Sequence, residues 1–404
     1  MGHWTTVRAA DFVEFNPRLS IKKGTRATKV AMDKLQPFTK KIPATEQAEF
    51  AGGSKFCNGD TIMARITPCL ENGKTAFVDI LADGEVAFGS TEFIVMRARE
   101  GISDPQFIYY LATSPVFRNV AIKSMVGSSG RQRVQQGVLD ELELTVPPLT
   151  EQKKIGAFLA ALDQKIAHND KINDNLQQQL ATIYRSWYQD FSRVADKEFV
   201  ETEYGMIPKG WHYALLGDLC QSISVTHKFD KEELIFLNTG DIEDGRFLHS
   251  NFMAVKDMPG QAKKTIAPGD ILYSEIRPIN RHFAFVNFPS ADYVVSTKLM
   301  VIRAKSFDVI RLYHYLTSDS VLSELQLQAE SRSGTFPQIR FDNVSRMPIL
   351  IADEQTERDF IELLHTVYAQ IEHINSENKK LSELRDNLLP MLMSGEIDVS
   401  GMHI

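Results

Sequence analysis

The sequence has few of the features that mark a secreted, metal-binding or membrane-spanning protein. It contains three cysteines among 404 residues, Cys57, Cys69 and Cys220, and they form no CxxC or Cys/His metal pattern. No apolar run approaches the roughly 20 residues that cross a membrane. Residues 1–4 lack the basic and then apolar order of a signal peptide. We therefore expect a cytoplasmic protein that carries free thiols and contacts no membrane.

The chain also lacks the motifs of common enzyme sites. There is no GxGxxG, GxxxxGK(S/T) or HExxH pattern. An FxGxG-like cofactor loop, an Asn-Pro-Pro-Tyr block and a PD…(D/E)xK cluster are missing as well. Asp163, Asp170 and Asp174 are spaced seven and four residues apart within a helical repeat, which predicts a solvated helix face. The sequence therefore favours a binding protein with no catalytic residue, cofactor or metal of its own.

What the chain does contain is a long internal repeat. Short matching segments recur at offsets between 203 and 210 residues. Such an offset indicates a duplicated domain, because solenoid units are about 20–50 residues long. The matches are Trp4 with Trp211, Asp11 with Asp218, Gly59-Asp60 with Gly269-Asp270, Ile66 and Pro68 with Ile276 and Pro278, Ser90-Thr91 with Ser296-Thr297, Arg97-Ala98 with Arg303-Ala304, and Glu151-Gln152 with Glu354-Gln355. Two copies of one domain predict a target that also comes in two parts.

Each copy is predicted to be a mixed α/β domain. In the first copy, 75–80 and 92–97 have the β-branched and aromatic composition of strands. Asp104 and Pro105 are an N-cap and a first-turn proline, and they predict a helix over 104–117. The second copy repeats this plan with strands at 283–286 and 299–302 and a helix near 308–327.

A heptad pattern follows each copy and predicts two long helices. Each run holds five heptads, which exceeds the three or four that indicate a coiled coil. Thr150 is the expected N-cap of the first helix, and Pro390 is expected to end or kink the second. The apolar seam is expected at Ile155, Leu159, Leu162, Ile166, Leu176, Leu180, Ile183 and Trp187 in the first run, and at Phe360, Leu364, Val367, Ile371, Ile374, Leu381 and Leu388 in the second.

The two helices have two alternative arrangements. They could form a coiled coil between two copies of the chain, or an internal antiparallel pair, which we favour because a folded domain separates them. The polar Asn169, Asn173 and Asn378 would then fix the register of the pair. A helix of about 40 residues is about 60 Å long, so the pair would act as a spacer. The predicted division is an α/β domain at 1–149, a helix at 150–198, an α/β domain at 199–352 and a helix at 353–404.

The net charge of −7 is unevenly distributed. Residues 353–404 contain 4 basic and 11 acidic residues, whereas residues 1–149 contain 18 and 16. Eight basic residues and one acid occur in 17–41. Because local patches rather than net charge attract phosphate, the first domain is a candidate for nucleic-acid binding and the C-terminal segment is not.

Several segments near the heptads match one known family. They are Val-Pro-Pro-Leu-Thr-Glu-Gln-Lys-Lys-Ile at 146–155, Leu-Asp-Gln-Lys-Ile at 162–166, Arg-Ser-Trp-Tyr-Gln-Asp-Phe at 185–191, Tyr-Gly-Met-Ile-Pro-Lys-Gly-Trp at 204–211, and the stretch 377–397. With these segments the chain resembles specificity subunits of Type I restriction-modification systems. The resemblance covers nearly the whole chain and is weakest in 12–55 and 220–265, where members of the family differ.

The resemblance implies a function and a set of partners. Each α/β domain would be a target recognition domain that reads one half of a split site in double-stranded DNA. The helices would set the gap between the halves and dock two methyltransferase subunits, which restriction and translocase subunits would join. S-adenosylmethionine, ATP and Mg would then be bound by these partners, and the chain itself would not be an enzyme.

Candidate DNA contacts follow from side-chain chemistry. Arginine reads guanine and glutamine reads adenine in the major groove. A Gly-containing loop in each domain offers such groups: Ser128, Ser129, Arg131, Gln132 and Arg133 in the first, and Arg332, Ser333, Thr335 and Gln338 in the second. The alternative is that these loops are solvated surface turns.

Other basic residues are candidates for phosphate contacts, which position a protein without specifying sequence. In the basic segment they are Lys22, Lys23, Arg26, Lys40 and Lys41, for which solubility is the alternative. Beside a proline-containing turn they are Arg65 and Lys74 in the first domain and Arg277 and Arg281 in the second. Trp187 and Tyr188 are expected to pack within the helices or dock a methyltransferase rather than stack on bases.

Two further hypotheses compete with a DNA-reading subunit. One is a self-sufficient DNA methyltransferase or nuclease whose motifs are not recognisable. The other is a coiled-coil scaffold that does not bind DNA. Salt-sensitive DNA binding would argue against the scaffold, and inactivity of the purified chain would argue against the enzyme.

Overall fold

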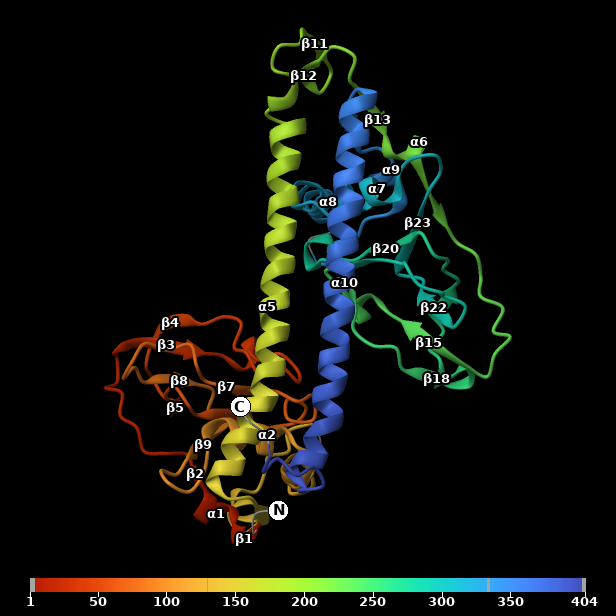
Figure 1. Cartoon of the computed structure of the whole chain (residues 1–404). Helices are drawn as coiled ribbons and strands as arrows, with labels where there is room; N and C mark the ends of the chain where they lie inside the picture. Colours follow the sequence, from red (N-terminus) through yellow and green to blue (C-terminus); the bar gives the residue numbers. More distant parts are fainter. Residues whose placement is uncertain (1–3, 129, 333–334, 402–404) are drawn as a thin grey trace. The chain divides into compact units, whose positions relative to one another are not determined.

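The computed structural model describes residues 4–128, 130–332 and 335–401. Its contacts divide the chain into two units: unit 1 comprises residues 1–172 and 374–404, and unit 2 comprises residues 173–373. Each unit contains an α/β domain and parts of two long helices, α5 (Leu149–Tyr188) and α10 (Glu354–Met393) (Figure 1). The predicted duplicated α/β architecture with two long helices is confirmed. The division into four segments stays a prediction.

Unit 1 is built from two four-stranded sheets and a short two-stranded sheet. Their strand orders are β2-β9-β6-β7, β4-β3-β8-β5 and β1-β10. The strands are β1 (Thr5–Arg8), β2 (Val13–Phe15), β3 (Arg26–Val30), β4 (Glu46–Glu49), β5 (Ser54–Phe56), β6 (Thr61–Ala64), β7 (Thr75–Phe77), β8 (Ala87–Gly89), β9 (Phe93–Ala98) and β10 (Glu143–Val146). The short helices are α1 (Ala9–Phe12), η1 (Met32–Lys34), α2 (Pro105–Thr113), α3 (Pro115–Lys123) and α4 (Gln136–Asp140).

The first sheet of unit 1 is buried on both faces. Ile62 in β6 pairs with Val95 in antiparallel β9, and both residues join the core shared with the second sheet. Their neighbours Met63 and Ile94 join the core that contains α2 and α3. Successive strand residues point to opposite faces, so a strand with a core on each side is apolar at every position. This accounts for the unbroken apolar run 93–96.

Unit 2 repeats the arrangement with additional short strands. Its sheets are β14-β23-β20-β21, β18-β15-β22-β19 and β13-β24, together with the pairs β11-β12 and β16-β17. The strands are β11 (Phe199–Thr202), β12 (Gly205–Pro208), β13 (His212–Leu215), β14 (Cys220–Ile223), β15 (Glu233–Leu237), β16 (Ile242–Glu243), β17 (Arg246–Phe247), β18 (Phe252–Ala254), β19 (Ala262–Lys264), β20 (Asp270–Ser274), β21 (Phe283–Phe285), β22 (Tyr293–Ser296), β23 (Leu299–Ala304) and β24 (Pro348–Ile351). The helices are η2 (Ser192–Val194), α6 (Leu216–Leu219), η3 (Thr239–Asp241), η4 (Val255–Asp257), η5 (Pro278–Asn280), α7 (Val309–Leu316), α8 (Asp319–Arg332) and α9 (Phe341–Ser345).

The two units share the order and direction of their main strands. The pair β3–β8 is parallel in unit 1, and the equivalent pair β15–β22 is parallel in unit 2. The double-faced burial is shared too: Leu272 and Val301 pair across β20 and β23 and join one core, while Ile271 and Ile302 join the other. The repeat in the sequence therefore reflects two copies of one three-layer fold, in which helices cover one sheet and a second sheet covers its other face.

Several predicted helix boundaries are wrong. Asp104 does cap α2, since its side chain accepts a hydrogen bond of 3.0 Å from the Phe107 amide. The helix predicted over 104–117 is nevertheless two helices, because Pro115 has no N–H to continue α2 and instead begins α3. In unit 2, the stretch near 308–327 is likewise divided into α7 and α8.

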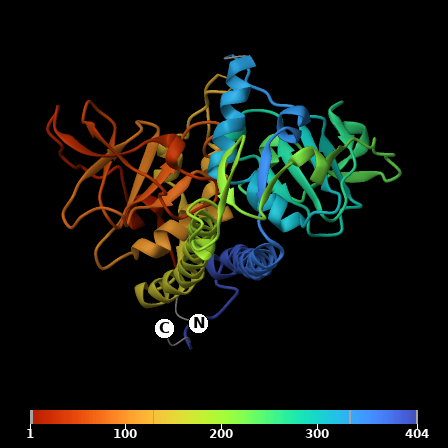
Figure 2. The same ribbon diagram turned by 90° about the horizontal axis from the view of Figure 1, so that it is seen from above.

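The long helices also differ from expectation at their ends. α5 begins at Leu149, so Thr150 lies inside the helix rather than at its N-cap. α10 continues through Pro390 to Met393, so the proline does not end the helix at its own position, and the alternative of a kink stays a prediction. Figure 2 shows α5 and α10 side by side, and side-chain contacts join them within each unit, so the internal antiparallel pair is confirmed.

Candidate nucleic-acid interface

The Gly-containing loop of unit 1 is held by backbone pairing to the proline turn that follows β6. Val126 and Arg133 exchange two backbone hydrogen bonds of 3.0 and 2.9 Å and so close the loop between them. Arg133 also forms a bridge with Ile66, and the Val134 amide donates to the Arg65 carbonyl at 2.9 Å. The loop and the turn therefore form one continuous surface.

Unit 2 contains the same construction. Gln338 forms a bridge with Ile276, and the Ile339 amide donates to the Glu275 carbonyl at 2.8 Å. The Arg277 amide donates to the Pro337 carbonyl at 3.2 Å. This register makes Gln338 the counterpart of Arg133.

The same pairing also shows that Arg65 and Arg277 occupy different positions of the turn. Arg65 and Arg277 lie near the same turn in the two sequences, but the bond pattern makes Glu275 the counterpart of Arg65. The basic residue beside the turn is therefore shifted along the chain in unit 2. The side chain of Arg277 is exposed, whereas that of Arg65 is half-buried.

The side chains of the unit 1 loop differ in their surroundings. Arg133 donates to both carboxylate oxygens of Glu92, with Nε at 3.0 Å from each and Nη2 at 2.7 Å from Oε1. Arg131 is exposed, and its side chain has no hydrogen bond or ion pair within the described residues. Gln132 is half-buried, and its carbonyl accepts the Thr67 amide at 3.0 Å. Ser128 is exposed, while Ser129 lies outside the described residues.

In unit 2 the loop residue Gln338 has a basic neighbour. Lys298 donates to Gln338 Oε1 at 3.3 Å and lies 3.7 Å from the Glu275 carboxylate. Thr335 is exposed. Ser333 and the side chain of Arg332 lie outside the described part of the chain.

Two arginines frame the turn after β20 in left-handed backbone conformations. Arg277 has φ 43° and Arg281 has φ 58°, and a non-glycine residue pays roughly 1–2 kcal/mol for this conformation. Arg281 donates to Asp244 at 2.9 Å and to Asp319 at 2.7 Å, which fixes its side chain. Arg277 is exposed at the same turn.

The basic segment of unit 1 separates into exposed and half-buried lysines. Four of its predicted phosphate contacts are exposed and form no ion pair within the described residues: Lys22, Lys23, Arg26 and Lys41. These four cations are available to a polyanion. The chemistry of the segment thus fits phosphate contact at these positions.

Lys40 is different, because its ammonium enters an aromatic box. It donates to Gln106 and to the Tyr110 hydroxyl, and lies 5.3 Å from the ring centres of Phe77 and Tyr109 and 4.8 Å from that of Tyr110. Burial lowers the pKa of Lys40 to about 8. The geometry gives Lys40 a structural position, so we leave it out of the interface.

Lys74 and Arg65 also direct their side chains to the protein. Lys74 Nζ donates to the Met32 carbonyl at 3.0 Å, and Arg65 Nη2 donates to the Val134 carbonyl at 3.4 Å. Both side chains are half-buried. They support the turn and the loop, and phosphate contact at these positions stays a prediction.

The predicted seam residues of α5 and α10 are buried or half-buried, and polar groups join the two helices within unit 1. Asn169 donates to Glu377 at 2.7 Å and to Asn378 at 2.8 Å. Arg385 donates to Asp163 at 2.6 Å, and the Tyr110 hydroxyl donates to the same carboxylate. The expectation that Asp163 lies on a solvated face is therefore wrong, since its side chain is 11% exposed.

Comparison with known proteins then assigns the family. The family model for the Type I restriction modification DNA specificity domain matches residues 1–178 and 208–383. The chain belongs to this family. The two matches fall on the two halves of the sequence repeat.

Individual relatives agree with this assignment. The chain is 41% identical over 181 residues to the HindI specificity subunit of Haemophilus influenzae, which covers 44% of this chain and 39% of that subunit. It is 23% identical over 306 residues to the MjaIX specificity subunit of Methanocaldococcus jannaschii, covering 73% and 69% of the two chains. The solved S subunit of a Type I system from M. genitalium is similar in fold, with a TM-score of 0.53 and 15% identity over 97% of this chain and 96% of that one.

Sequence reasoning missed the buried charge of the second specificity domain. Arg311 in α7 is fully buried and donates to Glu357 at 2.8 Å and to the Leu350 carbonyl at 3.1 Å. Its guanidinium lies 4.7 Å from the ring centre of Tyr188 and 5.3 Å from that of Phe360. The only signal in the sequence is an arginine within an apolar helical stretch.

The aromatic residues at the end of α5 pack within unit 2. The Trp187 ring lies 5.6 Å from that of Phe360, and the Arg193 guanidinium lies 4.2 Å from the Trp187 ring centre. Tyr188 is buried, and its hydroxyl donates to Glu357 at 2.7 Å. These contacts give both residues a packing role.

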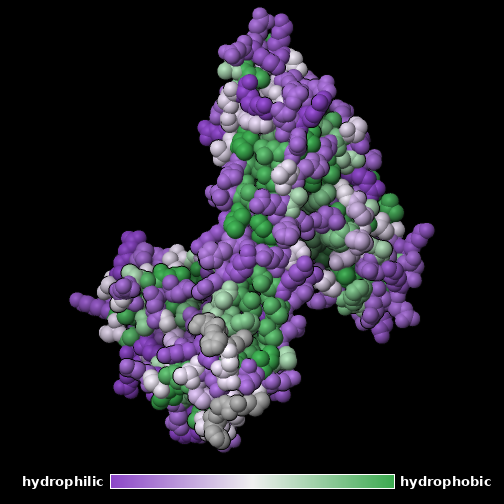
Figure 3. Space-filling view, viewed as in Figure 1, coloured by the Kyte–Doolittle hydropathy of each residue, from purple (hydrophilic) through white to green (hydrophobic). Residues whose placement is uncertain are grey.

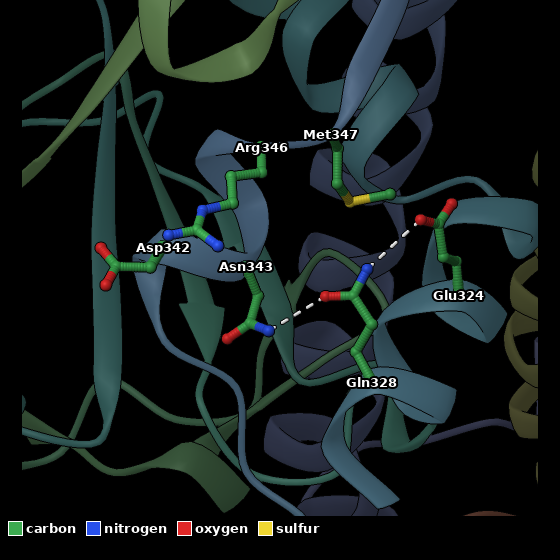
Figure 4. A pocket seen from close by; sticks show the side chains of 6 residues that line it. All are labelled: Glu324, Gln328, Asp342, Asn343, Arg346 and Met347. Atoms are coloured by element: carbon green, nitrogen blue, oxygen red, sulfur yellow. Dashed lines mark hydrogen bonds between the residues drawn. The ribbon is translucent and has the colours of Figure 1, made fainter. Parts of the chain in front are cut away.

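A small polar pocket lies between α8 and α9 of the second specificity domain (Figure 4). Gln328 donates to Glu324 at 3.2 Å and accepts from Asn343 at 3.0 Å. The remaining lining residues are Asp342, Arg346 and Met347. Because its amides bond to one another, we assign the pocket no ligand. Over residues 4–128, 130–332 and 335–401, no cluster of three His, Cys, Asp or Glu side chains could hold a metal ion, and no helix is long and apolar enough to cross a membrane.

Proposed function

We propose that the chain is the sequence-specific DNA-binding subunit of a Type I restriction-modification complex. Each α/β domain reads one half of a bipartite site in double-stranded DNA. The observation that carries this proposal is a surface that both units repeat, in which the Gly-containing loop pairs with the proline turn; we call it the loop-on-turn surface. The same backbone register presents polar side chains on this surface in both units. Membership of the specificity-domain family supports the same function.

The proposed contacts divide into two kinds. Base edges are read by polar side chains of the loops, and phosphates are held by exposed cations. The base-reading candidates are Ser128, Ser129, Arg131, Gln132, Arg133, Arg332, Ser333, Thr335 and Gln338. The phosphate candidates are Lys22, Lys23, Arg26, Lys41, Arg65, Lys74, Arg277 and Arg281, with Arg281 fixed by its two carboxylate partners.

The long helices are the proposed docking surface for two methyltransferase subunits. Apolar side chains appear on their surface in Figure 3, and in unit 1 Ile172 is 44% exposed and Leu384 is 45% exposed. Contiguous exposed apolar surface marks sites of association with other proteins. Restriction and translocase subunits would join this complex, which would act in the cytoplasm. S-adenosylmethionine, ATP and Mg would be bound by the partners, and this chain would not be catalytic.

Selection from a random duplex library tests the proposal. The full chain, together with a Type I methyltransferase subunit, is expected to enrich two short sequences separated by a constant gap. Its affinity should fall steeply with salt, because phosphate contacts release counterions. Enrichment of a single contiguous sequence, or binding that is independent of salt, would contradict the proposal.

A further inference from the structure

At two equivalent positions, the side chains of the two units differ in charge and in hydrogen-bonding groups. The bridges place Arg133 and Gln338 at the same point of the loop-on-turn surface. Glu92 and Lys298 each follow a Ser-Thr pair that leads into β9 or β23. Unit 1 thus sets an arginine beside a carboxylate, and unit 2 sets an amide beside an ammonium. The loop residue and its neighbour differ together.

Glu92 determines which edge of Arg133 is available. A guanidinium has five N–H donors. Glu92 accepts the Nε–H and one Nη2–H, with distances of 3.0 and 2.7 Å to Oε1. Three donors have no partner within the described residues. Two of them, one on Nη1 and one on Nη2, lie on the Nη1/Nη2 edge, which matches O6 and N7 of guanine. The Arg133 side chain is 46% exposed, so the edge is accessible, whereas Glu92 is 23% exposed.

Lys298 determines which way round the amide of Gln338 lies. An ammonium has no acceptor, so it bonds only to Oε1, here at 3.3 Å. Within the part of the chain that the structure describes, Oε1 keeps a second lone pair and both N–H groups of Nε2 have no acceptor. An acceptor and a donor side by side match N6–H and N7 of adenine.

We propose that Arg133 and Gln338 are the equivalent base-reading residues of the two units, with guanine as the target of Arg133 and adenine as the target of Gln338. Glu92 and Lys298 are positioning residues that hold these side chains in the reading orientation. The proposal deepens the proposed function and rests on it. One base is thereby assigned to one residue in each half-site.

An exchange of the pair tests the assignment. In the full chain with its methyltransferase, Glu92→Lys combined with Arg133→Gln is expected to change one guanine to adenine in one half-site selected from a random duplex library. The other half-site and the gap should be unchanged. The reciprocal Lys298→Glu with Gln338→Arg should change one adenine to guanine in the other half-site. Unchanged motifs in both exchanges would overturn the inference.

Single variants keep the test informative if an exchanged pair fails to fold. Arg133→Lys keeps a charge beside Glu92 but removes the fork, and should lower discrimination for guanine at that position at least about tenfold. Glu92→Gln should weaken discrimination at the same position only. Arg8→Gln breaks another exposed arginine–carboxylate pair of unit 1 and serves as the matched control, for which the motif should be unchanged.

A modified duplex supplies an independent readout. Replacing the assigned guanine by 7-deazaguanine removes the N7 acceptor. Wild-type affinity should fall about tenfold, and the Arg133→Ala variant should bind both duplexes equally. Equal loss by wild type and variant would overturn the inference while leaving the proposed function intact. If the wild-type chain enriches no bipartite motif, the proposed function fails and the inference falls with it.

Discussion

Arg385 in α10 donates a hydrogen bond of 2.6 Å to Asp163 in α5. The two side chains are 15% and 11% exposed, so this ion pair lies largely out of water in unit 1. The Tyr110 hydroxyl donates to the same carboxylate and ties the α/β domain to the helix pair. Coulombic attraction from Asp163 raises the pKa of Arg385 against the opposing effect of burial. The seam is therefore specified by polar contacts as well as by apolar packing.

Loss of Arg385 should destabilise unit 1. Arg385→Met leaves the Asp163 carboxylate without its cation, and breaking a buried pair from one side costs about 3 kcal/mol. Chemical denaturation should show this loss, and adding Asp163→Asn should recover part of it. Lys165→Met is the matched control, because its pair with Glu377 also joins the helices but is 50% and 40% exposed. Its cost should be below about 1 kcal/mol, and an equal cost would contradict the account.

Arg311 should be more sensitive still. It has no exposed surface, and Arg311→Met would leave Glu357 buried beside Tyr188 without a countercharge. The free energy of unfolding should fall by about 3–5 kcal/mol. A double variant with Glu357→Gln should be more stable than the single variant. A single variant as stable as wild type would show that the pair does not support this core.

Because of His314, the free energy of unfolding should depend on pH. Burial and the charge of Arg311 lower its pKa to about 3, so the folded protein holds it neutral. An unfolded histidine binds a proton below about pH 6.5. Stability should therefore fall by at most about 1.4 kcal/mol per unit as pH decreases from 6.5 toward 3. His314→Phe keeps a ring beside Tyr184 and should remove this slope.

The measurement is the difference in unfolding free energy between wild type and His314→Phe at several pH values. The difference cancels the titration of carboxylates that both proteins share. It should be constant above pH 7 and change steadily in favour of the variant below pH 6.5. A difference independent of pH would mean that the pKa of His314 is the same in the folded and unfolded protein, which would contradict the burial of a neutral ring.

The exposed Lys22 and Lys23 should affect DNA binding differently from Lys40, whose ammonium lies among aromatic rings. Lys22→Ala and Lys23→Ala should each reduce the slope of log affinity against log salt by about 0.9 if both lysines contact phosphate. Lys40→Met should leave the slope unchanged, because its ammonium faces the Tyr110 ring and hydroxyl. Equal slopes for all three variants would contradict the proposed division of the basic segment.

Much of the architecture follows from the sequence, because its signals are local or repeated. The heptads predicted both long helices, and Asp104 with Pro105 predicted where α2 begins. The break before Pro115 was also readable from the sequence, since proline cannot continue a helix, but the apolar periodicity continues across it. The matching Ser-Thr segments identified equivalent positions of the two units.

The candidate site was less predictable because its environment is assembled from distant segments. Lys40 belongs to a basic run, yet its box comes from Phe77, Tyr109 and Tyr110. Asp163 has the spacing of an exposed helical position, and only the docking of α2 and α10 buries it. Likewise, the register that matches Arg133 with Gln338 comes from backbone pairing across the loop, which no local sequence pattern specifies.

The two-reader architecture is tested most directly by mapping the methylated bases in cells that carry this chain together with a Type I methyltransferase subunit. Modified adenines are expected within one motif of two short halves around a fixed gap. A variant with Arg131→Ala and Gln132→Ala should relax one half and leave the other and the gap unchanged. Methylation in a single contiguous motif, or a variant that alters both halves equally, would contradict a chain built from two separate readers.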